Sequence, residues 1–229
     1  MDKSGFDDTL PDMEMEQSII YAFDIFGTLV FAITGAVKGV RCKLDFLGVI
    51  VLACTVGCGG GMLRDILIGA TPVAALSNSA YIIVCASAGV VVFFLAPIFV
   101  GRWRVILFLD AIGLGVFTAL GVAKGSMYGI GPVGQLLCGV FSAVGGGVIR
   151  DIMTRSIPTV LVSDFYATAS FIGGIMYLSL EYTPLGLLGR FLVCTFVVLF
   201  IRLLAIRYKF HLPVAKTALP VDDHLTMQN

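Results

Sequence analysis

The sequence predicts an all-α, polytopic membrane protein with seven transmembrane helices, arranged as two inverted three-helix repeats plus a seventh helix. Three observations lead to this fold class. Hydrophobic residues make up 58% of the 229 residues and charged residues 13%, whereas soluble domains carry about 25% charged residues. Seven apolar runs are long enough to cross a bilayer. A long stretch of the first half of the chain also recurs in the second half.

The internal duplication is clearest in one seven-residue pattern. The sequence GGGMLRD at residues 59–65 returns as GGGVIRD at residues 145–151. Aligning residues 24–77 with residues 110–163 gives 16 identities in 54 positions without a gap. Each half alone would leave the interface between the repeats open, so we expect one membrane domain rather than two.

The apolar runs place seven spans in order along the chain. These spans are predicted at residues 19–39, 46–69, 79–100, 104–124, 132–154, 163–180 and 187–206. The corresponding parts are a first repeat at 19–100, a second repeat at 101–186 and a seventh helix at 187–210. Because each repeat contains an odd number of spans, the second copy must enter the membrane from the opposite side, which inverts it relative to the first.

The two ends of the chain are expected to lie outside the membrane domain. Residues 1–18 are acidic and predict a disordered tail rather than a signal peptide. Lys and Arg gather after the first, third, fifth and seventh spans, and such residues favour the cytoplasmic side. The protein is therefore predicted to lie in the cell inner (plasma) membrane, with its N-terminus outside and residues 211–229 forming a cytoplasmic tail.

Each glycine triplet falls inside an apolar span, where one glycine costs a helix about 1 kcal/mol relative to alanine. Three in succession are expected to kink or unwind the helix, and the freed carbonyls could then coordinate a cation in a water-filled cavity. The alternative is close helix packing on a glycine surface. Two copies, each followed by Arg-Asp, favour the break. The candidate pore residues of this pattern are Gly59, Gly60, Gly61, Gly145, Gly146 and Gly147.

The Arg-Asp pairs supply four further candidates. Neighbouring residues on a helix point about 100° apart, so Arg64 is expected to pair poorly with Asp65, and Arg150 poorly with Asp151. The inverted symmetry instead predicts crossed pairs, Arg64 with Asp151 and Arg150 with Asp65, which line or gate a pathway. The alternative is a structural ion-pair lock between the repeats.

Four more candidates lie on the first span of each repeat. Asp24 and Lys38 share one face of the first span, and Asp110 and Lys124 share the matching face of the fourth. The two aspartates are expected near opposite mouths of a pathway, where acidic groups concentrate cations. The two lysines either extend to the membrane interface or take part in the pathway.

Composition and motifs exclude several other classes. The formal net charge is zero, so nucleic-acid binding is not expected. The six cysteines lack metal-ligand spacing and are interpreted as small hydrophobic residues at helix interfaces. No GxSxG, HExxH or P-loop pattern is present, so we expect neither an enzyme nor a cofactor nor a bound metal beyond permeant ions.

The paired GGGxxRD patterns, the three-plus-three-plus-one span count and the repeat length resemble the prokaryotic TRIC family, the relatives of trimeric intracellular cation channels. This family is related to bacterial membrane proteins of the glycine-transporter type. The resemblance covers residues 19–207 and implies a homotrimer in membrane lipids. It also implies a pore in each subunit that conducts K⁺ and Na⁺ beside the second and fifth spans.

Three functions remain open from the sequence. The leading hypothesis is a passive channel for monovalent cations. The rival is a secondary transporter for glycine or another small amino acid, since an inverted repeat suits alternating access equally well. The third is a structural membrane protein without transport, which the charged residues inside the spans disfavour because each costs at least ~2.5 kcal/mol when unpaired at the bilayer centre.

Overall fold

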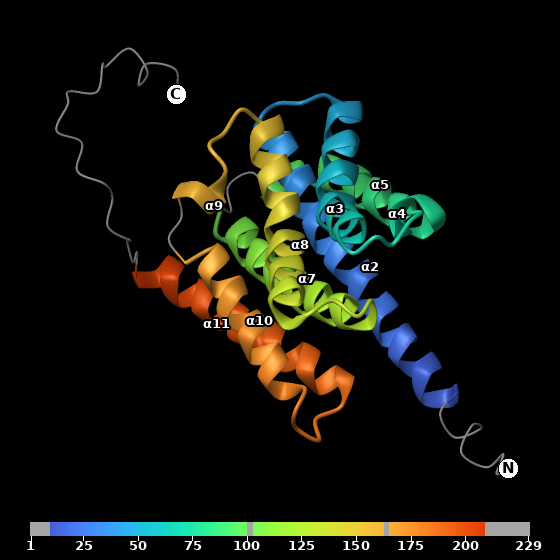
Figure 1. The fold of residues 1–229 in the computed structure, drawn as a ribbon. Helices are drawn as coiled ribbons and strands as arrows, with labels where there is room; N and C mark the ends of the chain where they lie inside the picture. The colour runs from blue at the N-terminus through green and yellow to red at the C-terminus, as the bar shows by residue number, and fades with distance from the viewer. Residues whose placement is uncertain (1–9, 100–102, 163–164, 209–229) are drawn as a thin grey trace, which may run out of the picture.

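The computed structural model describes residues 10–99, 103–162 and 165–208. Within these ranges the chain folds into helices and contains no strand. Figure 1 shows these helices gathered side by side in one bundle. In chain order they are α2 (Leu10–Arg41), α3 (Phe46–Leu67), α4 (Ala74–Ser77), α5 (Ser79–Phe94), α6 (Ala96–Phe99), α7 (Trp103–Met127), α8 (Pro132–Met153), α9 (Thr159–Val162), α10 (Ala167–Leu180) and α11 (Leu187–Tyr208).

Five of the described helices are long and apolar enough to cross a membrane, namely α2, α3, α7, α8 and α11. Helices α5 and α10 have 16 and 14 residues, fewer than the roughly 20 that a span requires. The span predicted at residues 79–100 is divided, because α5 ends at Phe94 and α6 follows with Pro97 in its first turn, a position that tolerates a residue without an N–H group.

The N-terminal boundary also differs from the prediction. Helix α2 begins at Leu10, so residues 10–18, expected in a disordered tail, are helical. Glu14 and Glu16 explain this difference, because glutamate is a good helix former and its charge favours the N-terminal end of a helix. Residues 1–9 and the predicted tail at 211–229 lie outside the described part of the chain.

Helices α3 and α8 pack against each other at the centre of the fold. Helix α3 also contacts α2 and α5, and α8 makes the matching contacts with α7 and α10. Of the five long helices, α7 is the most deeply buried and α11 the least. Helix α11 lies against α7 and α10 (Figure 1).

The glycine triplets do not unwind their helices, so the prediction of an unwound segment is wrong. Helix α3 is continuous through Gly59, Gly60 and Gly61, and α8 is continuous through the second triplet, Gly145, Gly146 and Gly147. The backbones approach so closely that a Cβ on Gly60 would overlap the carbonyl oxygen of Ser142. The alternative, close packing on a glycine surface, is confirmed. The carbonyls of the triplets remain in a helix and are not freed for a cation.

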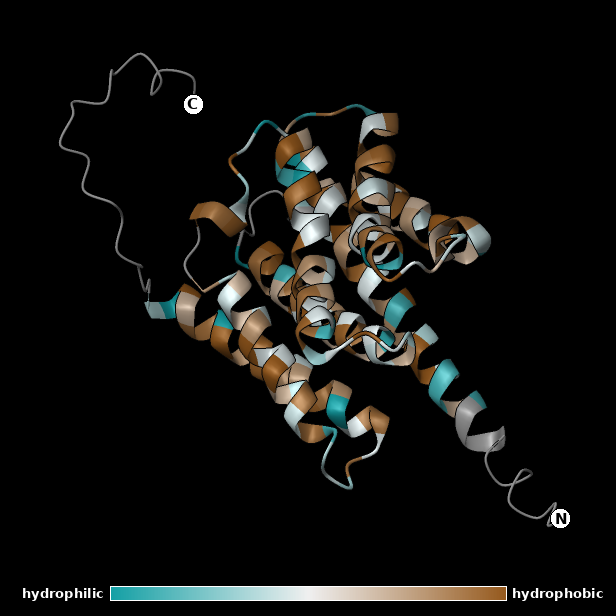
Figure 2. Ribbon diagram, viewed as in Figure 1, coloured by the Kyte–Doolittle hydropathy of each residue, from teal (hydrophilic) through white to brown (hydrophobic). Residues whose placement is uncertain are grey.

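The surface of the bundle is largely apolar. Figure 2 shows brown, hydrophobic residues along most helices, with teal positions interrupting them at a few points. Large side chains such as Phe94, Phe196 and Leu161 are more than half exposed. Exposed apolar surface of this extent suits contact with lipid rather than water.

Candidate functional site

The first charged cluster joins three helices around Asp24 of α2. Arg64 of α3 donates two hydrogen bonds to the carboxylate of Asp24, at 2.8 and 3.2 Å. Its Nε donates to Asp65 at 2.9 Å. Lys124 of α7 donates to Asp24 at 3.0 Å, and the hydroxyl of Tyr81 donates to the same carboxylate at 3.2 Å. All of the charged groups in this cluster therefore have a partner.

The second charged cluster occupies the matching positions of the second repeat. Arg150 of α8 donates to Asp110 of α7 at 2.7 Å and to Asp151 at 3.0 Å. It also donates to the hydroxyl of Thr34 on α2 at 3.4 Å. Lys38 of α2 lies in the same region but donates to the Ser156 hydroxyl at 3.0 Å. The two clusters thus share an Arg-Asp-Asp core and differ at the lysine.

The crossed ion pairs predicted from the sequence are wrong. Arg64 and Arg150 each pair with the aspartate that follows them and with an aspartate of their own repeat. Arginine has a long side chain whose Nε and terminal nitrogens donate in different directions. One guanidinium therefore reaches the next residue on its own helix and a neighbouring helix together, although the two Cβ atoms diverge. The repeats are connected instead by Lys124, which bonds Asp24.

Asp24 and Asp110, expected near opposite mouths of a pathway, are not free acidic groups. Asp24 and Asp110 are 1% and 3% exposed, and each is paired with an arginine. The lysines do not extend away from the clusters either, because Lys124 bonds Asp24 and Lys38 bonds Ser156. Burial without a partner costs several kcal/mol per charge, which explains why the charges collect into compact groups.

Asp65 and Asp151 also accept hydrogen bonds from the segments that follow α3 and α8. The other oxygen of Asp65 accepts from the backbone N–H of Ala74 at 2.9 Å, where α4 begins. The corresponding oxygen of Asp151 accepts from the N–H and hydroxyl of Thr159 at 2.8 and 2.7 Å, where α9 begins. Each carboxylate therefore fixes a short helix beside its cluster, in the way that an aspartate caps a helix N-terminus.

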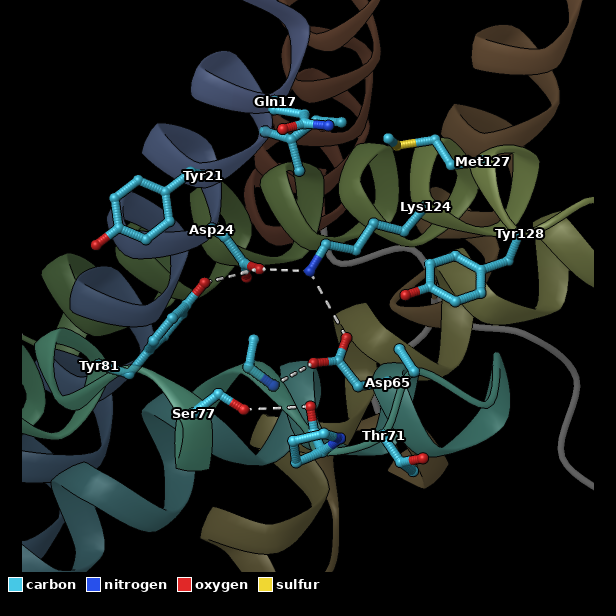
Figure 3. Close-up of a pocket in the computed structure, with 14 residues that line it drawn as sticks. Gln17, Tyr21, Asp24, Asp65, Thr71, Ser77, Tyr81, Lys124, Met127 and Tyr128 are labelled. Atoms are coloured by element: carbon cyan, nitrogen blue, oxygen red, sulfur yellow. Dashed lines mark hydrogen bonds and ion pairs between the residues drawn. The ribbon is translucent and has the colours of Figure 1, made fainter. Parts of the chain in front are cut away.

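A cavity lies against each charged cluster. The first cavity has a volume of about 420 Å³, and Asp24, Asp65 and Lys124 line it together with tyrosines. Figure 3 shows the ammonium of Lys124 between the carboxylates of Asp24 and Asp65, with Tyr81 on the other side of Asp24. The second cavity has a volume of about 210 Å³, and Lys38, Asp110, Arg150 and Asp151 line it.

An aromatic pair lies between the two cavities. The rings of Phe31 on α2 and Phe117 on α7 stack with their centroids 5.2 Å apart, and neither ring is exposed. In sequence each phenylalanine stands midway between the aspartate and the lysine of its own helix. Since Lys124 bonds Asp24 and the phenylalanines stack, α2 and α7 pass each other in opposite directions. Along both helices the rings thus lie between the residues that line the two cavities.

Sequence reasoning missed several polar contacts inside the bundle. Tyr81 contacts Asp24, and the fully buried Arg202 of α11 lies 4.7 Å above the ring of Tyr166. Thr34 and Ser156 contact a charged residue of the opposite repeat. The duplication carries no signal for Tyr81 or Thr34, because the aligned residues of the second repeat are Ala167 and Leu120.

Known proteins resemble this chain in sequence and in structure. A family model described as "Glycine transporter" matches residues 21–97 and 107–182. A membrane protein of Vibrio cholerae, named UPF0126 membrane protein, is 39% identical over 87% of this chain and 84% of its own length. The inner membrane protein YadS of Escherichia coli strain K12 is 36% identical over 85% of this chain and 95% of its own length.

The solved structures agree with the sequence matches. The crystal structure of the TRIC trimeric intracellular cation channel orthologue from Rhodobacter sphaeroides superposes with a TM-score of 0.81 at 30% identity. The match covers 84% of this chain and all of that one. Fold and sites therefore define an all-helical integral membrane protein with the TRIC channel fold. The chain belongs to the TRIC family, the family whose sequence model is described as "Glycine transporter".

Proposed function

We propose that this protein is a channel for the monovalent cations K⁺ and Na⁺, with one pathway in each subunit of a homotrimer in the inner (plasma) membrane. The observation that carries the proposal is the line of features along α2 and α7: a polar cavity, the stacked phenylalanines and a second polar cavity. The Rhodobacter protein with the same fold is described as a trimeric cation channel, which supports this assignment.

The proposed pathway runs past side-chain carboxylates rather than glycine carbonyls. A hydrated cation would enter the first cavity beside Asp24 and Asp65 and leave through the second beside Asp110 and Asp151, or travel the other way. In the present arrangement Phe31 and Phe117 close this path, so conduction requires the two rings to separate.

The inverted repeat forms part of the same proposal. The antiparallel passage of α2 and α7, with Lys124 beside Asp24 and Lys38 beside the second cluster, is the arrangement that two inverted copies produce. With the N-terminus outside, the two cavities would open toward opposite sides of the membrane. A pathway of this symmetry has a charged cluster at each entrance and its narrowest point at the twofold axis.

A second candidate is a transporter for glycine or a similar zwitterion. The family model carries the description "Glycine transporter", and the first cluster contains two carboxylates and two cationic side chains. Such a balanced set has no net preference for cations and suits a substrate with both charges. Lys124 would hold the substrate carboxylate, Asp65 its ammonium, and the closed phenylalanine pair would separate two alternately opened cavities.

Recordings of the purified protein in a planar bilayer distinguish the two candidates. With a KCl gradient across the membrane, a channel gives single-channel steps whose current reverses near the K⁺ equilibrium potential. The transporter gives no such steps. Liposomes that contain it instead accumulate labelled glycine at a saturable rate, and alanine or serine inhibits this uptake competitively. A well-folded preparation, judged by a single gel-filtration peak, that carries no current would refute the proposal that the protein is a channel.

Replacing Lys124 with glutamine tests the role of the first cluster. This change removes one positive charge from the wall of the first cavity, so cations concentrate there and their unitary current rises by about two- to threefold at low salt. The increase fades above ~1 M salt, where the screening length falls to about 3 Å. In the glycine transporter the same change removes the carboxylate partner and lowers uptake instead.

Lys38→Gln is the matched control in the second cavity. It should raise cation current entering from the opposite side of the membrane, so the two variants show rectification of opposite sign. Equal currents in both directions for Lys124→Gln, at every salt concentration, would contradict the proposed pathway.

A further inference from the structure

A third cavity, larger than the other two, lies on the outer surface of the bundle between α7 and α11. This α7–α11 groove has a volume of about 810 Å³. Its walls are mostly apolar, and two arginines line it, one from each helix. The residues that form it are Arg104, Val105, Leu107, Phe108, Leu203, Ile206 and Arg207.

The two helices present the same pattern to the groove. Arg104 stands in the first turn of α7, and Phe108 follows one turn deeper along that helix. Arg207 stands in the last turn of α11, and Leu203 precedes it by one turn. Phe108 and Leu203 are exposed. A cationic end and an apolar body therefore occur together on both walls of the groove.

Neither arginine has an ionic partner among the described residues of this chain, in contrast to Arg64 and Arg150. Arg104 also lies at the N-terminal end of α7, where the helix dipole disfavours positive charge. An anion between the two guanidinium groups would relieve this repulsion and accept hydrogen bonds from both. The groove therefore complements a molecule that has a negatively charged head and an apolar body.

We propose that the α7–α11 groove binds one anionic phospholipid. Its phosphate lies between Arg104 and Arg207, and an acyl chain follows Leu107, Phe108 and Leu203 into the membrane. Basic pockets between transmembrane helices recognise anionic head groups in this way, and phosphatidylglycerol is a lipid of this chemistry. The site contains no residue of either charged cluster, although Leu107 also lines the second cavity. It does not depend on whether the protein is a channel or a transporter.

Native mass spectrometry of the full-length protein tests this assignment. The wild type and the variants Arg104→Gln, Arg207→Gln and Arg104→Gln/Arg207→Gln are extracted in one mild detergent and titrated with phosphatidylglycerol. Each single change is expected to weaken retention of the lipid about fivefold and the double change about 30-fold. Phosphatidylethanolamine, which carries no net charge, should bind the wild type weakly and respond little to the changes.

Arg41→Gln is the matched control, because it removes an exposed arginine at the end of α2, outside the groove. It should leave phosphatidylglycerol retention within about twofold of the wild type. Equal retention by the wild type and the double variant would overturn the proposal. So would a double variant that loses its oligomeric state while keeping the lipid, since the groove would then be a contact between subunits. The single variants decide the matter if the double variant fails to fold.

Discussion

Replacing Arg64 with glutamine is expected to lower the free energy of unfolding by about 3–5 kcal/mol, the usual cost of removing one partner from a buried ion pair. The guanidinium is 1% exposed and donates to both Asp24 and Asp65. Glutamine is too short to reach both carboxylates and carries no charge. Without Arg64, Asp24 still contacts Lys124 and Tyr81. Asp65 still accepts from the N–H of Ala74, but its remaining cationic neighbour, Lys124, is 3.7 Å away.

Thermal unfolding in one detergent, followed by fluorescence and by the gel-filtration peak, measures the effect. For a chain of this length the loss corresponds to a fall in Tm of roughly 10 °C. Arg190→Gln is the control: this half-buried arginine at the start of α11 donates to the Leu185 carbonyl and has no carboxylate partner among the described residues. It should stay within about 1 kcal/mol of the wild type.

A pair of double variants separates the observed pairing from the crossed one. Arg64→Gln with Asp24→Asn removes both members of the observed pair and should regain part of the lost stability, because fewer buried charges remain uncompensated. Arg64→Gln with Asp151→Asn should regain none and lose more. A better recovery with Asp151→Asn would show that the ionic partners assigned here are incorrect.

Gly60→Ala is the second change with a large expected effect. Its methyl group would meet the backbone carbonyl of Ser142, and backbone of a neighbouring helix cannot turn aside as a side chain can. Helices α3 and α8 would have to separate, at a cost of about 1–3 kcal/mol for overpacking. Because these two helices form the centre of the fold, the change should lower Tm and weaken folding yield together.

The neighbouring glycine is the control for Gly60. A methyl group on Gly61 would find its nearest atoms at 3.7 Å, on Arg64 and Phe117, which is ordinary contact. Alanine is the better helix former by about 1 kcal/mol, so Gly61→Ala should leave Tm unchanged or raise it. Differential scanning calorimetry of both variants in the same detergent measures the two Tm values and checks this difference. Equal losses for Gly60→Ala and Gly61→Ala would contradict the packing assigned to this triplet.

The fold class and the importance of the repeated polar residues could be predicted because both depend on local sequence. Apolar composition is set residue by residue, and the duplication identified Asp24, Arg64 and Asp65 together with their counterparts before any contact was known. The partners of those residues could not be predicted. Helical periodicity gives the direction of a Cβ atom, but an arginine side chain extends well beyond it and can reach several neighbours.

The glycine triplets show the same division. Intrinsic propensity, about 1 kcal/mol per glycine, predicts a weakened helix in isolation. In the folded chain each triplet is covered by the backbone of the opposite helix, as the close approach of Gly146 to the Val56 carbonyl shows, a Cβ there lying 2.7 Å from the oxygen. The packing of α3 on α8 outweighs the low helix propensity of glycine. Helix propensity describes one helix in isolation, so it cannot include this packing.

The amino-acid sequence by itself determined that this chain enters a membrane, that its two halves share one design, and which charged side chains the design repeats. The tertiary structure alone decided that Lys124 joins Asp24 across the repeats and that Phe31 meets Phe117 between two cavities. Burial and repetition are properties of each residue and its neighbours along the chain. The choice of partner depends on how helices far apart in sequence are brought together, and this is set by the packing of the whole bundle.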